Sequence, residues 1–467
     1  MKKQLIAVAI AASFVGATTQ VQAAGFQLAE SSATGLGRAF AGEAAMADNP
    51  AVQGRNPAML SYLEGRQISA GAIYVMPDVD ATGQVSLASP LLPQSITMNA
   101  DALDVADNAA VPNFYYSNQL NDSWTWGLAL NSNYGLSTEL PAAHAASIFG
   151  NKTAITTVEL NTNIAYRIDE RFTVGAGLRG VYGDGEIGAS VPGWIEGVRA
   201  IPGLPAEVTS RLPAAGTELK HLEGDDFGYG WQLGASWQIN ANHRLGIAYH
   251  SHVELDLDGQ ARGLVYTDGN AEVDGYLPLE LPAFAELASY HQLTDNWAMH
   301  ASINWTDWSV FNKLVAYFPG EQKPIDPATK QPISSDLVKE ENFKDNWRFA
   351  LGTSYQLNNA WLLRAGVALD KTAVDDEYRT ITIPDTDRLW FSIGVGYAPS
   401  KNLTVDLGLT YIHAHGDAPI TETQDLMGHG DAPINETQDP MGLAQVAFQG
   451  DASGHVWLAG LQVTYKM

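Results

Sequence analysis

Apolar and polar side chains alternate along many short stretches of this chain. From Val456 to Met467 every odd-numbered position is apolar, and Gly, Gln, Thr and Lys occupy most of the positions between them. Residues 346–355 repeat the pattern, with Trp, Phe, Leu, Thr and Tyr at the odd-numbered positions. A period of two predicts β-strands with one apolar face. About 9 to 11 residues suffice for a strand to cross a membrane, although a soluble antiparallel sandwich shows the same alternation.

Between these stretches a short turn with neighbouring aromatic residues returns six times. "YQLNNAW" at 355–361 is the clearest copy, and related segments lie at 116–124, 166–172, 237–245, 290–297 and 397–403. Asn, Asp and Pro favour tight reversals of the chain. Tyr and Trp favour the boundary between lipid and water, where bacterial barrels carry aromatic girdles beside short turns. We therefore predict that the six turns lie on one rim of a barrel.

The turns also predict the number of strands. Six inner turns, with a first strand that starts near Gln67 and a last strand that ends at Met467, delimit seven hairpins. We predict an all-β protein in which residues 66–467 form a 14-stranded antiparallel transmembrane β-barrel. An even number of strands, with both ends on the same side, is typical of bacterial barrels. Closure of the sheet removes the free edges that lipid cannot hydrogen-bond.

The first 65 residues do not alternate in this way. Residues 1–23 contain two Lys, an apolar run from Leu5 to Gly16 and the small-residue ending "VQA", which predicts a secretory signal peptide. Residues 24–65 are rich in Gly and Ala and are too hydrophobic for a flexible linker. Because a barrel of this size leaves a lumen to be filled, we predict that they form an N-terminal plug, or hatch, inside it.

The charge balance argues against one class of partner. The chain has 52 acidic and 26 basic residues, a formal net charge of -26, so we expect no nucleic acid partner. A signal peptide followed by spanning strands instead predicts a multi-pass protein of the bacterial outer membrane.

Several motifs resemble those of a known family. They are "AGFQLAESSATGLGRAFAGEAAMAD" at 24–48, "RNPA" at 55–58, "NSNYGLSTE" at 131–139, "NFKDNWRFALG" at 342–352 and "ITIPDTDRLW" at 381–390. They are similar to motifs of the FadL family of Gram-negative outer-membrane long-chain fatty-acid transporters, and the resemblance spans essentially the whole mature chain. It implies a 14-stranded barrel closed by a hatch, and passive uptake of hydrophobic ligands through a lumen pocket. It also implies rearrangement of the hatch and lateral release through a gap beside a kinked third strand.

The resemblance implies which residues bind the ligand. A basic residue of the family's inner pocket lies in the "FKD" motif, which gives Lys344 here, and strand alternation predicts Arg348 on the same face. The resemblance places Phe26 and Leu28 of the hatch against that pocket. A second basic pocket residue of the family is missing near Ala189, so we expect head-group recognition to differ.

Residues 132–135 interrupt the predicted third strand. The alternation of residues 126–131 stops at "SNYG", where Gly permits a kink and Asn can satisfy a freed backbone group. A strand that simply ends at an outer loop is the alternative, but the resemblance favours a kink. The expected lateral gate is Ser132, Asn133, Tyr134 and Gly135, and the hatch motif is Asn56, Pro57 and Ala58.

The outer loop at 189–221 carries apolar residues at partly helical spacing. In the family this loop and the one near 264–266 form a hydrophobic surface groove that receives ligand, whereas a loop that packs its own small core explains the spacing equally well. The candidate groove residues are Trp194, Ile195, Val198 and Ile201.

Other chemistries lack support in the sequence. No nucleophile with an ordered His and carboxylate is present, so we expect no enzyme activity and no cofactor. The pairs His250/His252 and His413/His415 lack a further ligand, so we expect no metal. An open aqueous porin would not need a plug, and uptake of aromatic or other hydrophobic compounds remains the alternative within the family.

The expected partners are long-chain fatty acids or similar molecules, outer-membrane lipid and lipopolysaccharide, and the protein is expected to be a monomer. A local duplication at 416–442 indicates loop expansion.

Overall fold

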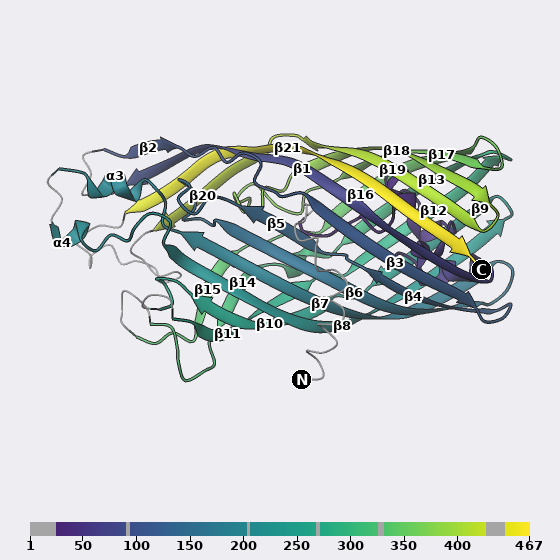
Figure 1. Ribbon diagram of the computed structural model, residues 1–467, viewed down its shortest axis with the longest axis horizontal. Helices are drawn as coiled ribbons and strands as arrows, with labels where there is room; N and C mark the ends of the chain where they lie inside the picture. Colours follow the sequence, from purple (N-terminus) through teal and green to yellow (C-terminus); the bar gives the residue numbers. More distant parts are fainter. Residues whose placement is uncertain (1–24, 90–93, 203–205, 268–270, 326–330, 426–443) are drawn as a thin grey trace.

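The computed structural model describes residues 25–89, 94–202, 206–267, 271–325, 331–425 and 444–467. The predicted signal peptide at 1–23 and most of the duplication, from residue 426 onward, lie outside these residues. One antiparallel sheet of 21 strand segments closes on itself, because β1 pairs with β21 as well as with β2 and β3 (Figure 1).

The strand segments have the following bounds. They are β1 (Arg66–Ala88), β2 (Ile96–Asn99), β3 (Ala109–Gln119), β4 (Trp124–Asn131), β5 (Gly135–Glu139), β6 (Lys152–Arg167), β7 (Phe172–Ser190), β8 (Glu218–Asn240), β9 (His243–His250), β10 (Val253–Arg262), β11 (Val273–Leu281), β12 (Phe284–Thr294), β13 (Trp297–Thr306), β14 (Lys313–Tyr317), β15 (Ser335–Glu340), β16 (Asn346–Gln356), β17 (Trp361–Asp370), β18 (Asp387–Ser400), β19 (Leu403–His415), β20 (Pro419–Asp425) and β21 (Gln445–Lys466).

These 21 segments make 14 wall strands. Seven strands are continuous, and the other seven are split into the segment pairs β2/β3, β4/β5, β9/β10, β11/β12, β13/β14, β15/β16 and β19/β20. The number of strands predicted from the six turns is therefore confirmed. The sequence pattern did not reveal the splits, because a split changes the register by only a residue or two.

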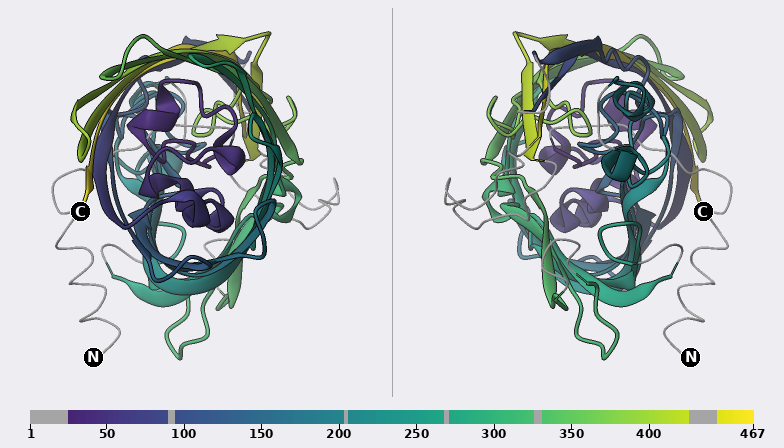
Figure 2. Two further views of the ribbon diagram at one scale, coloured as in Figure 1. Left: turned by 90° about the vertical axis from the view of Figure 1, so that its right-hand side faces the viewer. Right: turned by 90° about the vertical axis from the view of Figure 1, so that its left-hand side faces the viewer.

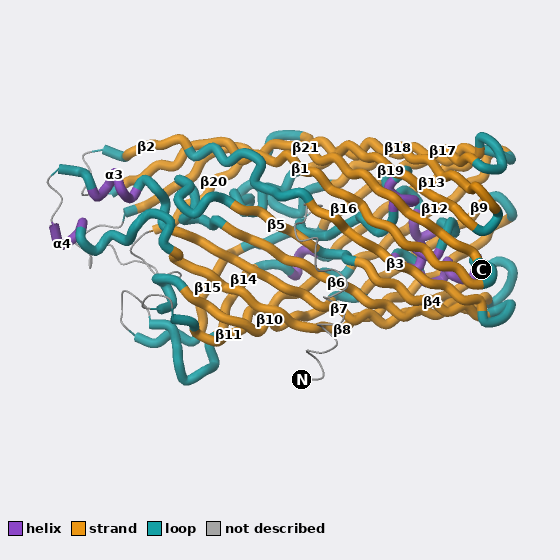
Figure 3. The backbone as a smooth tube through the Cα atoms, in the orientation of Figure 1, coloured by secondary structure: helices purple, strands orange, loops and turns teal. Residues whose placement is uncertain are grey.

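The six predicted turns lie together at the right-hand end of the barrel in Figure 1, beside the C-terminus. Each one joins two consecutive wall strands, and although Tyr116 and Tyr290 are half-buried, most of the aromatic residues beside the turns are exposed. They also stand opposite one another across strands, as in the Trp124–Tyr166, Phe172–Trp237 and Trp361–Tyr397 pairs, whose ring centroids are 4.5, 6.1 and 4.5 Å apart. The predicted aromatic rim is thus confirmed. Long loops and the helices α3 (Ile195–Arg199) and α4 (Ala206–Thr209) lie at the opposite, outer end (Figure 3).

The two faces of the wall differ as the alternation predicts. In β16, Trp347, Phe349 and Leu351 are 44 to 48% exposed on the outside, whereas Arg348 and Ala350 are buried toward the lumen. Because the outward side chains form an apolar surface, this face suits lipid. No helix among the described residues is long and apolar enough to span a membrane.

Residues 25–65 lie inside the ring of strands (Figure 2). They contain one turn of α-helix, α2 (Ala33–Leu36), and the 3-10 helices η1 (Glu43–Ala45), η2 (Pro50–Gly54) and η3 (Pro57–Tyr62). We call residues 25–31 the arm and residues 33–62 the plug body. The plug body packs directly against glycines of the wall. A Cβ built at Gly366 would lie 2.1 Å from the carbonyl oxygen of Arg38, and one at Gly246 would lie 1.9 Å from that of Ala44, so neither position has room for a side chain.

Candidate ligand-binding site

An apolar cavity lies between the arm and the wall. It holds about 720 Å³ of space not occupied by protein atoms, part of which opens to solvent. Most of its lining is aliphatic or aromatic and comes from β5, β6, β7, β8, β10, β11 and β14, with Leu136, Leu257, Leu277 and Leu314 as examples. Ile383, from the loop between β17 and β18, and Phe26, from the arm, complete it.

Phe26 of the arm and four aromatic rings of the wall and its loops form a cluster of five at the base of this cavity. The ring of Phe26 lies 4.5 Å from that of Trp308 and 5.2 Å from that of Phe311, in edge-on contacts. Tyr134 and Phe343 extend the cluster at 6.2 Å from Phe26 and 4.9 Å from Phe311. All five side chains are at most 5% exposed. We call this set the aromatic partition.

A second, more polar cavity begins two residues farther along the arm. Its lining includes Leu28 and Phe284, the cations Arg55 and Arg348, and the carboxylates Glu43, Glu286 and Asp370. Arg348 donates from Nη2 to the carbonyl of Ala39 at 2.8 Å, while its buried Nε has no hydrogen-bond partner among the described residues. Arg348, which lines this cavity, therefore keeps one donor without a protein partner among the described residues.

The arm pairs with the interrupted third strand. The amide of Leu28 donates to the carbonyl of Asn133 at 2.7 Å, and the amide of Gly135 donates to the carbonyl of Phe26 at 2.8 Å. β5 pairs with β6, and none of its described residues is in register with a residue of β3. The arm, which lies inside the ring of strands, thus supplies backbone hydrogen bonds to the segment at residues 132–135.

A change of register produces the interruption. Asn131 stands opposite Glu159 and Gly135 opposite Thr156, so three residues of one strand face two of the other. None of residues 132–135 is among the described residues with a positive φ. The kink is therefore a bulge, and Gly135 does not adopt the positive φ that favours glycine. Of the four expected gate residues, Ser132 and Tyr134 are held by the Thr157 hydroxyl, which donates to the Tyr134 carbonyl at 2.7 Å.

Lys344 does not share the inward face of Arg348. Alternation toward the lumen begins at Asn346, where β16 starts, and the side chain of Lys344 is 48% exposed and ion-paired with Asp375. It faces a groove among the outer loops that is separate from the two cavities. The predicted orientation was wrong because the strand pattern was extended beyond the first residue of the strand.

The hatch motif stabilises the plug body. Asn56 caps η3, since its Oδ1 accepts from the Ala58 amide at 2.9 Å, and Pro57 takes the first helical position. The Asn56 Nδ2 donates to the carbonyls of Ala44 at 2.7 Å and of Ala235 in β8 at 3.2 Å. The motif therefore joins two turns of the plug to the wall.

The candidate groove residues lie on and beside α3. Ile195 is 8% exposed, and Trp194 donates from Nε1 to the carbonyl of Ala145 at 2.9 Å. Trp194 and Val198 pack against an outer cluster that includes Leu140 and Ile148, and Ile201 is half-buried. This arrangement resembles a loop packed over its own core, so the groove assignment stays a prediction.

Glu341, just before β16, is buried without a partner at the outer end. Neither carboxylate oxygen has a hydrogen-bond partner among the described residues. Burial raises the pKa of Glu341 to about 7, Lys339 partly opposes this rise, and Glu422 adds to it. Below the ordinary carboxyl pKa both folded and unfolded states are protonated. Between the ordinary carboxyl pKa and about 7 the unfolded state ionises this group while the folded state keeps it protonated, so local stability falls across this range and then levels off.

Replacing Glu341 by Gln is expected to remove this pH dependence. The difference between pKa values corresponds to at most about 3 kcal/mol. Hydrogen exchange at the Phe343 amide, which donates to the carbonyl of Phe311 at 3.1 Å, reports local opening. Between pH 4.5 and about 7 its protection should fall in the natural protein relative to the variant, and above this range the ratio should level off. A constant ratio across this range would contradict the assignment.

Sequence reasoning missed several residues of this site. Trp308, Phe311 and Phe343 were not singled out, because they lie where β13/β14 and β15/β16 are split and alternation stops. Glu159 and Arg179 were also missed, although charged residues at inward positions of apolar strands are a usable signal.

Comparisons with known proteins agree with this architecture. The family model described as "Outer membrane protein transport protein (OMPP1/FadL/TodX)" matches residues 14–467. The chain belongs to this family. It is therefore an outer-membrane protein of a transport family, and the resemblance seen in its motifs is confirmed. A long-chain fatty acid transport protein of Escherichia coli is 34% identical over 476 residues, which cover 98% of this chain and 97% of that protein. Outer membrane protein P1 of Haemophilus influenzae is 36% identical over 420 residues, covering 86% and 89%.

Solved structures of OMPP1/FadL/TodX proteins share the fold. A Pseudomonas aeruginosa FadL homologue superimposes with a TM-score of 0.75 at 22% identity, covering 95% of this chain and 100% of that one. The Pseudomonas putida toluene transporter TodX superimposes with a TM-score of 0.62 at 18% identity, with the same coverage.

Proposed function

We propose that this protein takes up long-chain fatty acids across the outer membrane without an energy source of its own. The observation that carries the proposal is the apolar cavity bounded by Phe26 of the arm, because the same arm pairs with the interrupted strand. A ligand that fills the cavity reaches the residues whose movement would open the wall. The name of the 34% identical Escherichia coli relative supports the substrate class.

Burial of the alkyl chain supplies enough free energy for binding. Each methylene removed from water contributes roughly 0.8 kcal/mol, so a 16-carbon chain gains on the order of 10 kcal/mol in an apolar cavity. Release sideways into lipid keeps the chain out of water. A straight path to the periplasm would forfeit this gain, and it would also meet the plug body, which wall glycines hold closely. Lateral release at residues 132–135 therefore fits the energetics.

Arg348 is the proposed partner of the ligand's carboxylate in the second cavity, with Leu28 beside it and Phe26 at the boundary. Its unpaired Nε supports this role. Lys344 is half-exposed and already paired with Asp375, so its role is confined to the outer loops.

Uptake of aromatic compounds is the second candidate function. The aromatic partition favours it, because edge-on ring contacts also suit an aromatic ligand. The fold shared with a toluene transporter agrees with this reading.

The remaining proposals concern partners and processing. A closed sheet has no free edge, which favours a monomer, and its apolar outer face suits membrane lipid, with lipopolysaccharide at the outer end. We also propose that residues 1–23 are removed on export, that 24–65 act as the plug, and that the barrel has no enzymatic role.

The function is tested by replacing Leu257 with Gln. Leu257 is 7% exposed and lines the apolar cavity, so a buried amide there should weaken palmitate binding by about tenfold or more. Binding to the purified protein and uptake into cells that lack other fatty-acid transporters are measured together.

Leu103→Gln is the matched control, because Leu103 is 66% exposed. It should leave both quantities unchanged. Palmitate binding that survives Leu257→Gln intact would contradict the assignment of this cavity as the binding site. Displacement of palmitate by toluene at lower concentration than by other fatty acids would refute the proposal in favour of its alternative.

A further inference from the structure

A buried ion pair stands at the interruption of the third wall strand. Arg179 in β7 donates from Nε and Nη2 to the two oxygens of Glu159 in β6, at 3.0 and 2.7 Å. Their side chains are 0% and 1% exposed. Burying two charges has a desolvation cost that the attraction between them often only offsets, so such a pair is weak evidence for stability. What this pair does supply is a fixed geometry, because a bidentate contact sets both position and angle.

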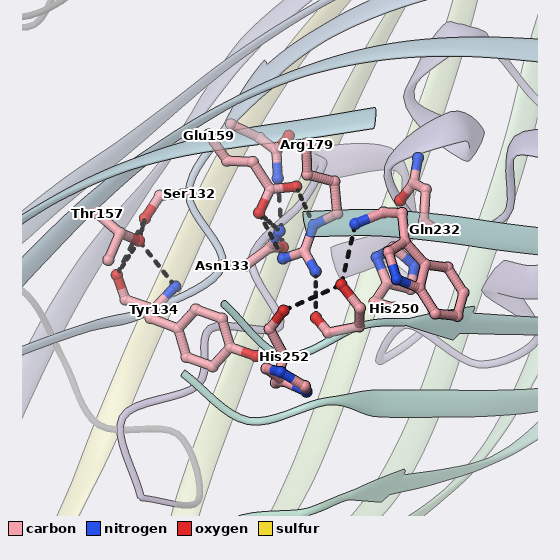
Figure 4. A network of polar contacts seen from close by, with 12 residues as sticks. Ser132, Asn133, Tyr134, Thr157, Glu159, Arg179, Gln232, His250 and His252 are labelled. Atoms are coloured by element: carbon pink, nitrogen blue, oxygen red, sulfur yellow. Dashed lines mark hydrogen bonds and ion pairs between the residues drawn. The ribbon is translucent and has the colours of Figure 1, made fainter. Parts of the chain in front are cut away.

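The ion pair holds the interrupted segment through Asn133. Glu159 is the last residue of β6 that pairs with β4 before the bulge, and its Oε2 accepts from the Asn133 Nδ2 at 2.9 Å (Figure 4). The carbonyl of Asn133 accepts from the Leu28 amide of the arm at 2.7 Å. One residue therefore connects the carboxylate in the wall to the arm in the lumen.

Arg179 extends the connection to a second split in the wall. Its Nη1 donates to the carbonyl of Ser251 at 2.7 Å, between the end of β9 and the start of β10. The preceding residue, His250, stacks on Phe284 with centroids 4.1 Å apart, and its Nε2 lies 3.0 Å from the carbonyl of Arg55 in the plug body. The ion pair thus connects two interruptions of the wall. The first contacts the arm, and the second contacts the plug body.

We propose that Glu159 and Arg179 are positioning residues that hold residues 132–135 and the arm in register, and so control how readily the arm leaves the wall. This inference extends the proposed function. It rests on that function only where it concerns the effect on transport. When the arm moves, Phe26 and Leu28 leave the boundaries of both cavities. The strength of the ion pair therefore sets the release rate of a bound ligand more than its affinity.

The test replaces both charges at once, since removing only one leaves a buried unpaired charge. In the full-length protein, Glu159→Gln combined with Arg179→Gln should speed hydrogen exchange at the Leu28 and Gly135 amides by roughly tenfold. These amides form the two bonds between arm and segment. Bound palmitate should also dissociate faster.

A matched control is available in the wall. Arg364 and Asp406 form an ion pair of 2.7 Å with side chains 4% and 2% exposed, and Asp406 contacts Thr34 of the plug body, not the arm. Arg364→Gln with Asp406→Asn should leave exchange at Leu28 and Gly135 unchanged. Equal acceleration in the control, or no acceleration in the test variant, overturns the proposal.

A second variant covers failure of the double variant to fold. Asn133→Leu keeps the ion pair and removes the side-chain amide that joins it to the segment, together with the bond that this amide accepts from Asn131 at 3.3 Å, so it should accelerate exchange at the same two amides. Unchanged exchange in this variant also overturns the proposal. Because hydrogen exchange needs no ligand, absence of palmitate binding in the natural protein would refute the proposed function while leaving this test valid.

Discussion

A protein that lacks residues 25–62 is expected to insert as a barrel and to conduct ions on the order of a hundredfold better than the full chain in planar bilayers. It should also lose specific palmitate binding, since Phe26 and Leu28 go with the plug. The reason is that the wall is complete without the plug. The closing pair β1–β21 and every other wall pair involve only residues after 65.

Water that enters the lumen allows the deletion variant to fold as a barrel. Inward residues such as Glu286, Arg364 and Asp406 lose plug contacts, but water then reaches them and replaces those hydrogen bonds. A gel shift between heated and unheated samples checks that the barrel has formed. A folded deletion variant that conducts no better than the full chain would mean that the outer loops, not residues 25–62, close the pore.

Gly366→Val is expected to displace the plug body without removing it. Gly366 faces the lumen in β17, and an added Cβ would stand 2.1 Å from the carbonyl oxygen of Arg38 and 2.2 Å from its carbonyl carbon. Both are backbone atoms, so no side chain can rotate away, and overpacking of this kind costs at least about 1 to 3 kcal/mol. Conductance should rise to a value between those of the full chain and the deletion variant, and protease from the turn side should cut the plug faster.

Gly197→Val is the control for this change. Gly197 lies in α3, and a Cβ there meets nothing within 4 Å. It should alter neither conductance nor cleavage. If Gly366→Val behaves like Gly197→Val, the plug body is less closely fitted than its contacts with the wall glycines indicate.

The barrel itself was predictable because two signals agreed. Alternation predicted which side chains lie on each face of a strand, and turns such as residues 355–361 predicted where the chain reverses between strands. An error in either signal would have given the wrong number of strands. Both are local properties. The inner plug was predictable for a related reason, since residues 24–65 failed the alternation that the rest of the chain obeys.

The site was less predictable, because it depends on register and on distant contacts. Whether Lys344 faces inward depends on where β16 starts, and alternation alone does not mark that residue. The bulge at residues 132–135 follows from one extra residue relative to β6, which no single strand reveals. Likewise, the meeting of Phe26 with Trp308 joins positions that are far apart in the chain and share no pattern.

The seam between β1 and β21 has a consequence for assembly in the membrane. Residues 67–88 pair with residues 445–466, so the first and last strands meet only when synthesis and export of the whole chain are complete. The plug body precedes β1, and its backbone fits against glycines in β7, β9 and β17 too closely to be threaded into a finished ring. We therefore expect the plug body to be enclosed before the seam joins. In this order of events the strands close around a plug that is already in place. A plug from a relative with different turns would therefore hinder closure of the barrel, in addition to packing poorly inside it.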